Sequence, residues 1–196
     1  MTARAGKEAR HALAKRKDDF YATPPEAVAA FLRAERPFLP SVLWEPACGD
    51  GAIVLPLRAA GYRVHATDLV SRGCPDSRAG EDFLMPFPVP PDLGGVVTNP
   101  PFKLAREFVE RGLLVAPYVA MLLRLGFLEG ADRRPWFERG CLARVHVSSR
   151  RLPMMHRDGW EGKKSGSSMS FAWFVWDRRH RGEPVIRWFD WREAAE

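Results

Sequence analysis

Two short segments of this sequence carry residues whose types and spacing could do chemistry. The first, EPACGDG (residues 45–51), follows a strand-like run, and its glycines let the backbone approach a ligand closely. The second, NPPF (residues 99–102), follows another strand-like run. Its prolines remove two N–H donors and stiffen the turn, so the Asn99 side chain and the Pro100 carbonyl offer oxygen acceptors beside an aromatic ring. Such an array fits a planar molecule that carries an NH₂ group.

Acidic residues end two further strand-like segments. Asp68 stands seventeen positions after Gly51, where a carboxylate can hold a ribose hydroxyl, and Asp82 can accept a hydrogen bond from an exocyclic amine. An isolated Asp after a strand is more often a helix cap than a ligand. The prediction of a binding site therefore rests on all four strand ends (45–51, Asp68, Asp82 and 99–102) and on their order in the sequence. That order indicates a nucleoside-containing cofactor. A nicotinamide or ATP site is disfavoured, because neither GxGxxG nor a P-loop lysine is present.

The elements that must position these residues alternate between strands and helices, which predicts a parallel sheet covered on both faces. Ligands of such sheets bind outside the carboxyl ends of the strands. After Pro135 two long β-like stretches flank a polar, glycine-rich loop, and they predict a hairpin added to the sheet edge. Thr23 is expected to cap the first helix. The expected strands are 42–44, 63–67, one ending at 81–83, 95–98, 118–125, 142–154 and 170–176, and the expected helices are one after Thr23, 53–60 and 103–115.

The segments 45–51 and 99–102, in this order, resemble the class I S-adenosylmethionine-dependent methyltransferases of the N6-adenine branch, particularly the small phage and prophage forms. The resemblance runs from about residue 19 to about residue 176. It implies a Rossmann-like α/β fold with a mostly parallel seven-stranded sheet, an antiparallel edge hairpin and helices on both faces. It also implies transfer of a methyl group from S-adenosylmethionine to N6 of adenine in DNA.

The same resemblance implies roles for individual residues. In the family, the glycine loop contacts the amino-acid moiety of the cofactor, the first acid holds the ribose, and the second acid with its aromatic neighbour binds and flanks the adenine. The implied catalytic residues are Asn99, Pro100, Pro101 and Phe102. The implied cofactor-binding residues are Tyr21, Thr23, Glu45, Pro46, Ala47, Cys48, Gly49, Asp68, Leu69, Asp82, Phe83 and Asn99. The expected substrate-binding residues are Phe102, Lys103, Arg124, Trp160, Lys163 and Lys164, and no metal site is expected.

Length and charge suggest the domain organisation and the partner. The 196 residues predict a basic flexible arm (1–18) and a single methyltransferase domain (19–196) without a separate target-recognition domain. The net charge is +6, and residues 133–187 hold thirteen Lys and Arg against five acids. Such a surplus suits a polyanion. We therefore expect DNA with a flipped-out adenine as the partner, and relaxed or short sequence recognition, as a phage would use against restriction.

Other features bear on compartment and on the C-terminus. Three cysteines without a CxxC pair argue against disulfides and zinc, and no apolar stretch is long enough to span a membrane. With no secretory signal at the N-terminus, a cytoplasmic protein is expected. The aromatic cluster WFDW (residues 188–191) is expected to form a strand that caps the core. Nothing in the sequence indicates the oligomeric state.

Three alternative functions remain open. NPP followed by Phe or Tyr also occurs in enzymes that methylate adenine or guanine in RNA, and in enzymes that methylate glutamine side chains of proteins. The basic blocks disfavour a protein substrate, whereas they fit RNA as well as DNA. A non-catalytic DNA-binding module is disfavoured because both motifs, 45–51 and 99–102, are intact.

Overall fold

The structure is a computed structural model, and it describes residues 22–86, 88–152 and 169–192. Within these residues eight strands form one sheet. The strands are β1 (Val42–Glu45), β2 (Arg63–Asp68), β3 (Arg78–Ala79), β4 (Gly95–Thr98), β5 (Tyr118–Arg124), β6 (Leu142–Ser148), β7 (Phe171–Asp177) and β8 (Val185–Phe189). Their spatial order is β3-β2-β1-β4-β5-β7-β6-β8.

The sheet is mostly parallel, and its strand order reverses between β1 and β4. All pairings among β1 to β5 are parallel, whereas β7 runs antiparallel to both of its neighbours, β5 and β6. Two expectations need correction. The sheet has eight strands rather than seven, and the predicted hairpin is not at the edge, because β8 pairs in parallel with β6 and forms the edge itself.

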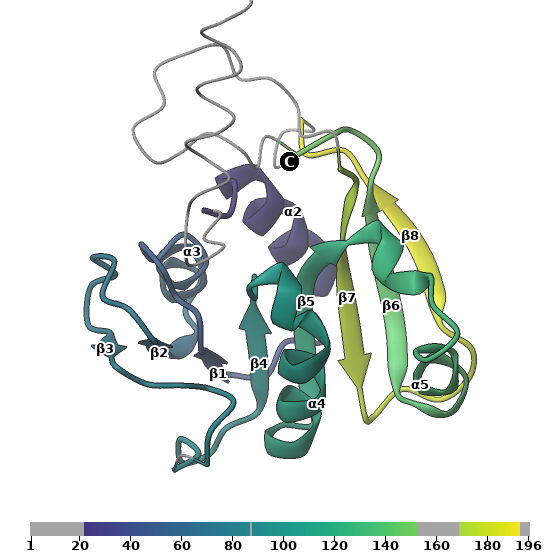
Figure 1. Ribbon diagram of the computed structural model, residues 1–196. Coiled ribbons are helices and arrows are strands. Elements are labelled where there is room, and N and C mark those ends of the chain that lie inside the picture. Colours follow the sequence, from purple (N-terminus) through teal and green to yellow (C-terminus); the bar gives the residue numbers. More distant parts are fainter. Residues whose placement is uncertain (1–21, 87, 153–168, 193–196) are drawn as a thin grey trace, which may run out of the picture.

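Helices cover both faces of the sheet (Figure 1). The helices α2 (Pro25–Glu35) and α3 (Val54–Ala59) bury their apolar sides in one core cluster with β1, β2 and β7. On the other face α4 (Ala105–Val115), the 3₁₀ turn η2 (Leu125–Leu128) and α5 (Arg134–Arg139) pack over a second cluster. A short 3₁₀ turn, η1 (Phe102–Leu104), leads into α4. Both faces of the central strands are therefore buried, as expected for a doubly covered sheet.

Most predicted elements lie within a few residues of the observed ones. Two strands and one helix cap differ from the prediction. The third strand is the two-residue β3, and it ends before the predicted 81–83. Thr23 does not cap α2, because the N-cap residue is Pro24 and no side chain bonds the free N–H groups there. The predicted strand 142–154 ends as β6 at Ser148.

The C-terminal aromatic cluster forms a strand that covers the core only in part. The last residue of β8, Phe189, and the nearby Trp191 pack against the core cluster beneath α2. Trp188 points the other way and is 69% exposed. The expectation of a core-capping strand is thus confirmed for Phe189 and wrong for Trp188.

A buried ionic cluster joins the C-terminal end of α2 to the strands. The Glu35 carboxylate accepts hydrogen bonds from Arg144 Nε (2.6 Å), Arg144 Nη2 (2.9 Å) and the Tyr118 hydroxyl (2.9 Å), and it lies 2.6 Å from His146 Nε2. Arg144 also lies 3.6 Å from Asp177. These side chains are all buried. They anchor α2 at the end of the sheet opposite the carboxyl ends of the parallel strands.

Within the described ranges, no helix is long and apolar enough to cross a membrane, and no group of three or more potential metal-ligating side chains occurs. The predicted basic arm (1–18) and the glycine-rich loop (156–166) lie outside the described residues.

Candidate active site

The glycine loop turns sharply at the carboxyl end of β1. Gly49 and Gly51 have φ angles of 55° and 91°, in the left-handed region that favours glycine. At Gly51 a Cβ atom would lie 3.2 Å from the Cys74 sulfur, so close packing also favours glycine. The glycines therefore set the course of the turn, and the residues of this segment that border the space above the strand are Ala47, Cys48, Asp50, Ala52 and Ile53.

Asp68 fixes this loop to the end of β2. Its Oδ2 accepts the Gly49 N–H at 2.8 Å, and its Oδ1 accepts the Val70 N–H at 2.9 Å. Because β1 and β2 are parallel neighbours, their ends meet at one edge of the sheet, where these bonds can form. Each carboxylate oxygen has two lone pairs, so Asp68 can accept further hydrogen bonds from a ligand in the cleft.

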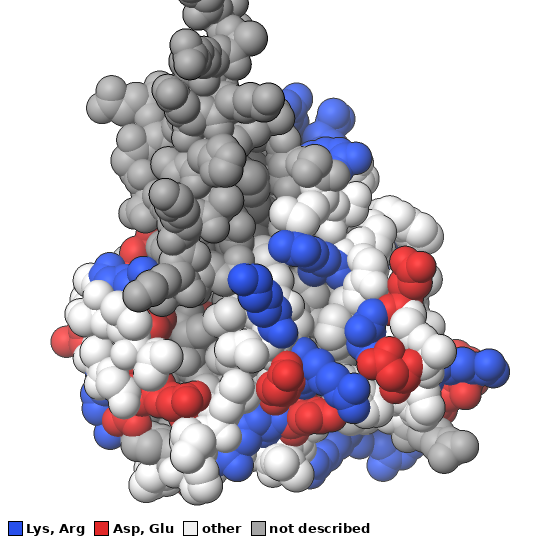
Figure 2. Space-filling view, in the orientation of Figure 1, with Lys and Arg blue, Asp and Glu red and all other residues white. Residues whose placement is uncertain are grey.

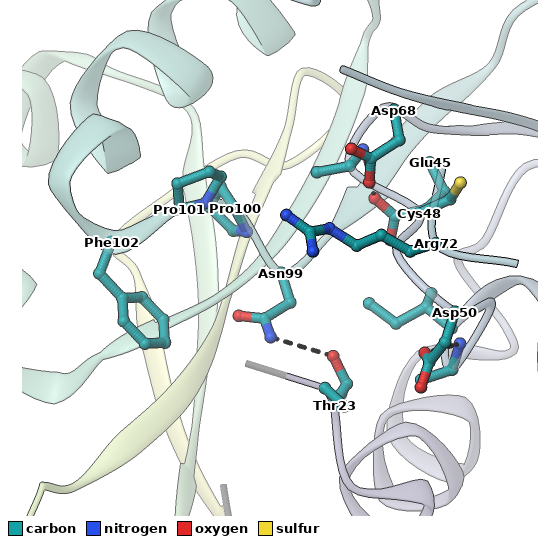
Figure 3. A pocket seen from close by; sticks show the side chains of 14 residues that line it. Thr23, Glu45, Cys48, Asp50, Asp68, Arg72, Asn99, Pro100, Pro101 and Phe102 are labelled. Carbon is teal, nitrogen blue, oxygen red and sulfur yellow. Dashed lines mark hydrogen bonds between the residues drawn. The ribbon is translucent and has the colours of Figure 1, made fainter. Parts of the chain in front are cut away.

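The NPPF turn (99–102) follows β4 on the other side of β1. Asn99 donates from its Nδ2 to the Thr23 hydroxyl at 3.1 Å. Figure 3 shows that the amide nitrogen points at Thr23 and that the amide oxygen lies on the side of Phe102. Pro101 has a φ of −54° and leads directly into η1. The turn thus places an amide and an aromatic ring next to each other at the cleft.

Two neighbours hold the Phe102 ring. The guanidinium of Arg124, at the end of β5, lies 4.9 Å from the ring centroid, and the Phe171 ring packs at 5.4 Å with a 41° tilt. Arg124 and Lys103, which follows Phe102 in the chain, are exposed. Neither of these predicted substrate-binding residues lines the cleft itself, but Arg124 contacts the Phe102 ring that does.

Glu45, the last residue of β1, is only 1% exposed. Burial, with a smaller contribution from the nearby Asp68 charge, raises the pKa of its carboxyl to about 8. The Ala47 N–H, which donates to Oε1 at 3.0 Å, opposes this rise because it favours the charged form. Burial also raises the pKa of the Cys48 thiol to about 12, so this thiol stays protonated and is not a nucleophile at neutral pH.

These segments line one cleft across the reversal in strand order, where open α/β sheets bind ligands (Figure 3). The predicted site residues that line it are Thr23, Glu45, Ala47, Cys48, Asp68, Asn99, Pro100, Pro101 and Phe102. Residues separated by almost eighty positions in the chain thus come together in one place.

Several predicted cofactor-binding residues do not line this cleft. Phe83 is 3% exposed and packs edge-on against Trp44 and beside Phe108 in the core, each with ring centroids 5.1 Å apart. Asp82 accepts the Leu84 N–H at 3.0 Å and so stabilises a turn. The others are the buried Pro46 and Gly49 and the exposed Leu69. Tyr21, Trp160, Lys163 and Lys164 lie outside the described residues.

The cleft also contains residues that the sequence reasoning missed. Asp50, Ala52 and Ile53 belong to the glycine segment or directly follow it, so its proximity could have indicated them. Arg72 comes from the loop after β2, and Figure 3 shows its guanidinium between the glycine loop and Pro100. No local pattern around Arg72 marks it, since only the course of that loop brings it to the cleft.

No family model matches this sequence, and a search of curated proteins finds no match either. Solved structures do match. The chain is similar to the type I restriction-modification methyltransferase subunit from Streptococcus thermophilus, with a TM-score of 0.59 and 16% identity over 91% of this chain and 51% of that chain. It is similar to a proposed RNA methyltransferase from Pyrococcus horikoshii, with a TM-score of 0.58 and 14% identity over 87% and 96%. It is also similar to a dimethyladenosine transferase from Plasmodium falciparum, with a TM-score of 0.52 and 12% identity over 81% of this chain and 63% of that chain.

At these identities the likeness establishes the fold. The chain has the Rossmann-like α/β fold that these methyltransferases share, and it spans about half the length of the Streptococcus protein. The fold alone does not define the activity, which depends on the residues of the cleft.

Proposed function

We propose that this protein is an S-adenosylmethionine-dependent methyltransferase that acts on N6 of adenine in DNA. The observation that carries the proposal is the NPPF turn (99–102), which lines the same cleft as the glycine loop and Asp68. The fold that the chain shares with methyltransferases supports it. The basic surplus of the sequence supports a nucleic acid as substrate.

The residues present fit the proposed cofactor. The positive φ angles of Gly49 and Gly51 turn the loop along the cleft, and the fixed carboxylate of Asp68 can accept from ribose hydroxyls. Glu45, with its raised pKa, is buried beside the loop and carries no full charge at neutral pH. S-adenosylmethionine, when bound, supplies a methyl group activated by a positively charged sulfur.

Asn99 and Pro100 supply the acceptors for the substrate amine. The lone pair of N6 is delocalised into the adenine ring, which makes the nitrogen a poor nucleophile. Hydrogen bonds from both amino hydrogens, one to Asn99 Oδ1 and one to the Pro100 carbonyl, localise this pair on nitrogen. As positive charge develops there, both oxygens bind more strongly, so they favour the transition state over the ground state. The amine loses a proton once it has been methylated, because the product cation is acidic.

Phe102 and the cations at the rim orient the base and its backbone. The Phe102 ring, held by Arg124 and Phe171, offers a surface on which a base can stack. A base inside a duplex cannot reach the cleft, so the adenine must be flipped out or single-stranded. Figure 2 shows Lys and Arg side chains across the middle of the face that carries α4, with Asp and Glu interspersed. Lys103 and Arg124 are exposed and can contact phosphates.

Relaxed or short sequence recognition and a role in phages or prophages belong to the same proposal. Within the described part of the chain, α4, β5, η2 and α5 fill the interval between Phe102 and β6, which leaves no separate recognition domain there. Digestion with methylation-sensitive enzymes tests this point. Modification confined to a single long site would contradict it.

RNA is the second candidate substrate. Its support is the fold similarity to a dimethyladenosine transferase and to a 23S rRNA methyltransferase, at 12% and 18% identity. The same turn can present its acceptors to an exocyclic amine of either nucleic acid.

Methyl transfer in parallel onto DNA, RNA and protein tests the proposal. Purified protein is incubated with tritiated S-adenosylmethionine and each substrate, and the nucleosides are then identified by mass spectrometry. We expect N6-methyladenine in DNA, formed about 100- to 1,000-fold more slowly with Asn99→Ala. Label in RNA alone would replace DNA with the second candidate, and label in no substrate would overturn the methyltransferase proposal.

A further inference from the structure

We infer that Thr23 is a positioning residue that sets which end of the Asn99 amide faces the substrate. The inference rests on the proposed function, because it concerns the acceptor that Asn99 offers to the amine. It differs from the role that the sequence suggested for Thr23, which was to bind the cofactor.

The hydroxyl of Thr23 does not cap the helix α2, as the sequence predicts, but forms a different hydrogen bond. The N-cap residue of α2 is Pro24, and no side chain caps the helix. Thr23 is instead 3% exposed at the cleft, and its Oγ1 accepts the Asn99 Nδ2–H at 3.1 Å. A side chain just before one helix therefore contacts the residue that directly follows β4.

Orientation matters because the two ends of an amide are chemically opposite. The NH₂ end only donates hydrogen bonds and the oxygen end only accepts them. With Nδ2 directed to Thr23, the oxygen lies on the side of Phe102, where the proposed substrate ring stacks (Figure 3). A rotation of the amide by 180° would present donors to the donors of the substrate amine. Such a rotamer would not only fail to activate the nitrogen but would also repel it.

Thr23 is well placed to hold this orientation because its side chain and the backbone that carries it are themselves rigid. Its side chain is β-branched and therefore stiff at χ1, and two prolines, Pro24 and Pro25, follow it. The helix that begins there is held along its length by core packing and by the Trp173 Nε1–H, which donates to the Ala27 carbonyl at 3.0 Å. Its far end is anchored by the buried Glu35 cluster. The acceptor is thus set before the substrate arrives, which is how preorganised groups lower a barrier.

A kinetic split separates positioning from cofactor binding. Thr23→Val removes the hydroxyl and keeps the shape. We expect kcat at saturating cofactor to fall about tenfold, the size of one hydrogen bond, while the cofactor Kd stays within about twofold. Thr23→Ser keeps the hydroxyl and should retain kcat within about threefold. A rise in cofactor Kd with unchanged kcat would overturn the inference and restore Thr23 as a cofactor ligand.

A matched control accounts for the loss of a buried hydroxyl as such. The Thr67 hydroxyl accepts the Trp44 Nε1–H at 2.9 Å, is buried like that of Thr23 and does not line the cleft. Thr67→Val should leave kcat within about twofold of the unaltered protein. An equal fall in kcat for Thr67→Val and Thr23→Val would reduce the effect of Thr23 to general destabilisation and contradict the inference.

The side-chain amide of Asn99 gives a readout that needs no activity. Its NH₂ signals in a ¹⁵N–¹H correlation spectrum are assigned by their loss in Asn99→Asp. We expect one amide proton to move upfield and to exchange faster with solvent in Thr23→Val, and not in Thr23→Ser. An unchanged signal in Thr23→Val would refute the hydrogen bond whether or not the protein transfers methyl groups. Absence of transfer by the unaltered protein, with the signal shifting as expected, would refute the proposed function alone.

Discussion

Glu35 and Glu45 are both buried, at opposite ends of the sheet, and their surroundings treat the charge in opposite ways. Burial alone would raise the pKa of Glu35, but hydrogen bonds from His146 and Arg144 outweigh it and hold that pKa below its usual range. Burial, together with a smaller contribution from the Asp68 charge, raises the pKa of Glu45 to about 8. At the end of the sheet that holds Glu35, hydrogen bonds and ion pairs compensate the buried charge. At the end that holds Glu45, the buried carboxyl lies beside a cleft.

The difference teaches which end of the fold serves stability and which serves a ligand. A carboxylate that accepts from Arg144, Tyr118 and His146 has little capacity left, and it fixes α2 to the strands. A buried carboxyl with a strongly raised pKa, in a cleft, is the pattern typical of functional sites. One helix, α2, connects the two ends, with Glu35 near its C-terminus and Thr23 just before its N-terminus.

The largest effect on stability is expected at Glu35. Glu35→Gln leaves the Arg144 guanidinium buried without its counter-charge, so the free energy of unfolding should fall by about 3–5 kcal/mol. Urea denaturation measures this. The control is Glu110→Gln, which breaks the exposed pair with Arg106 (3.2 Å) and should change the free energy by no more than about 0.5 kcal/mol. Similar losses in the two variants would remove the distinction between the ends.

A smaller effect on stability is expected at Glu45, and its pH dependence is opposite to that of Glu35. Its folded-state pKa lies above the usual 4.5, so the folded state favours the protonated acid. This stability is fully present below about pH 4.5 and is lost as the pH rises through about 8, by about 2–4 kcal/mol. Glu45→Gln mimics the protonated form, so its stability relative to the unaltered protein should rise over that range. Glu35, with a lowered pKa, loses its contribution only as the pH falls below about 4.5.

That difference is measured by denaturation of both proteins at pH 5, 6, 7 and 8. A constant gap between Glu45→Gln and the unaltered protein across this range would mean that Glu45 ionises normally. In that case the contrast between the two glutamates would disappear.

The smallest effect concerns Asp68 and is seen in ligand binding. Asp68→Asn keeps the shape but replaces one acceptor by a donor, which weakens the support of the Gly49 and Val70 N–H groups and the proposed ribose contact. We expect the Kd for S-adenosylmethionine to rise about tenfold in calorimetric titration. Asp92→Asn, an exposed change 3.5 Å from Arg63, serves as the control and should leave the Kd unchanged. Equal Kd values for all three proteins would place the cofactor away from Asp68.

Local patterns in the sequence were sufficient to predict most strands and the centre of the site. The strands that lead to Glu45, Asp68 and Asn99 contain buried apolar or β-branched residues and are followed by polar ones, and parallel strands bring such ends to one edge. The two-residue β3 lacks any such run, so its position was misjudged. The parallel edge strand β8 depends on pairing with β6, which no local signal encodes.

Contacts between distant residues account for what the sequence could not reveal. The Thr23–Asn99 hydrogen bond spans 76 positions, so the capping pattern around Thr23 gave the wrong role for its hydroxyl. The Glu35–Arg144 pair spans 109 positions, and neither residue stands in a motif. Phe83 resembled a base-flanking aromatic, but packing against Trp44 and Phe108 draws it into the core.

Asn99→Ala, assayed for transfer and for cofactor binding on the same preparation, tests most directly whether this cleft activates an amine. We expect the rate of methyl transfer to fall about 100- to 1,000-fold, because a preorganised acceptor is removed, while the Kd for S-adenosylmethionine stays within about twofold. Transfer that persists at nearly the original rate, or that falls only in step with cofactor binding, would contradict the account.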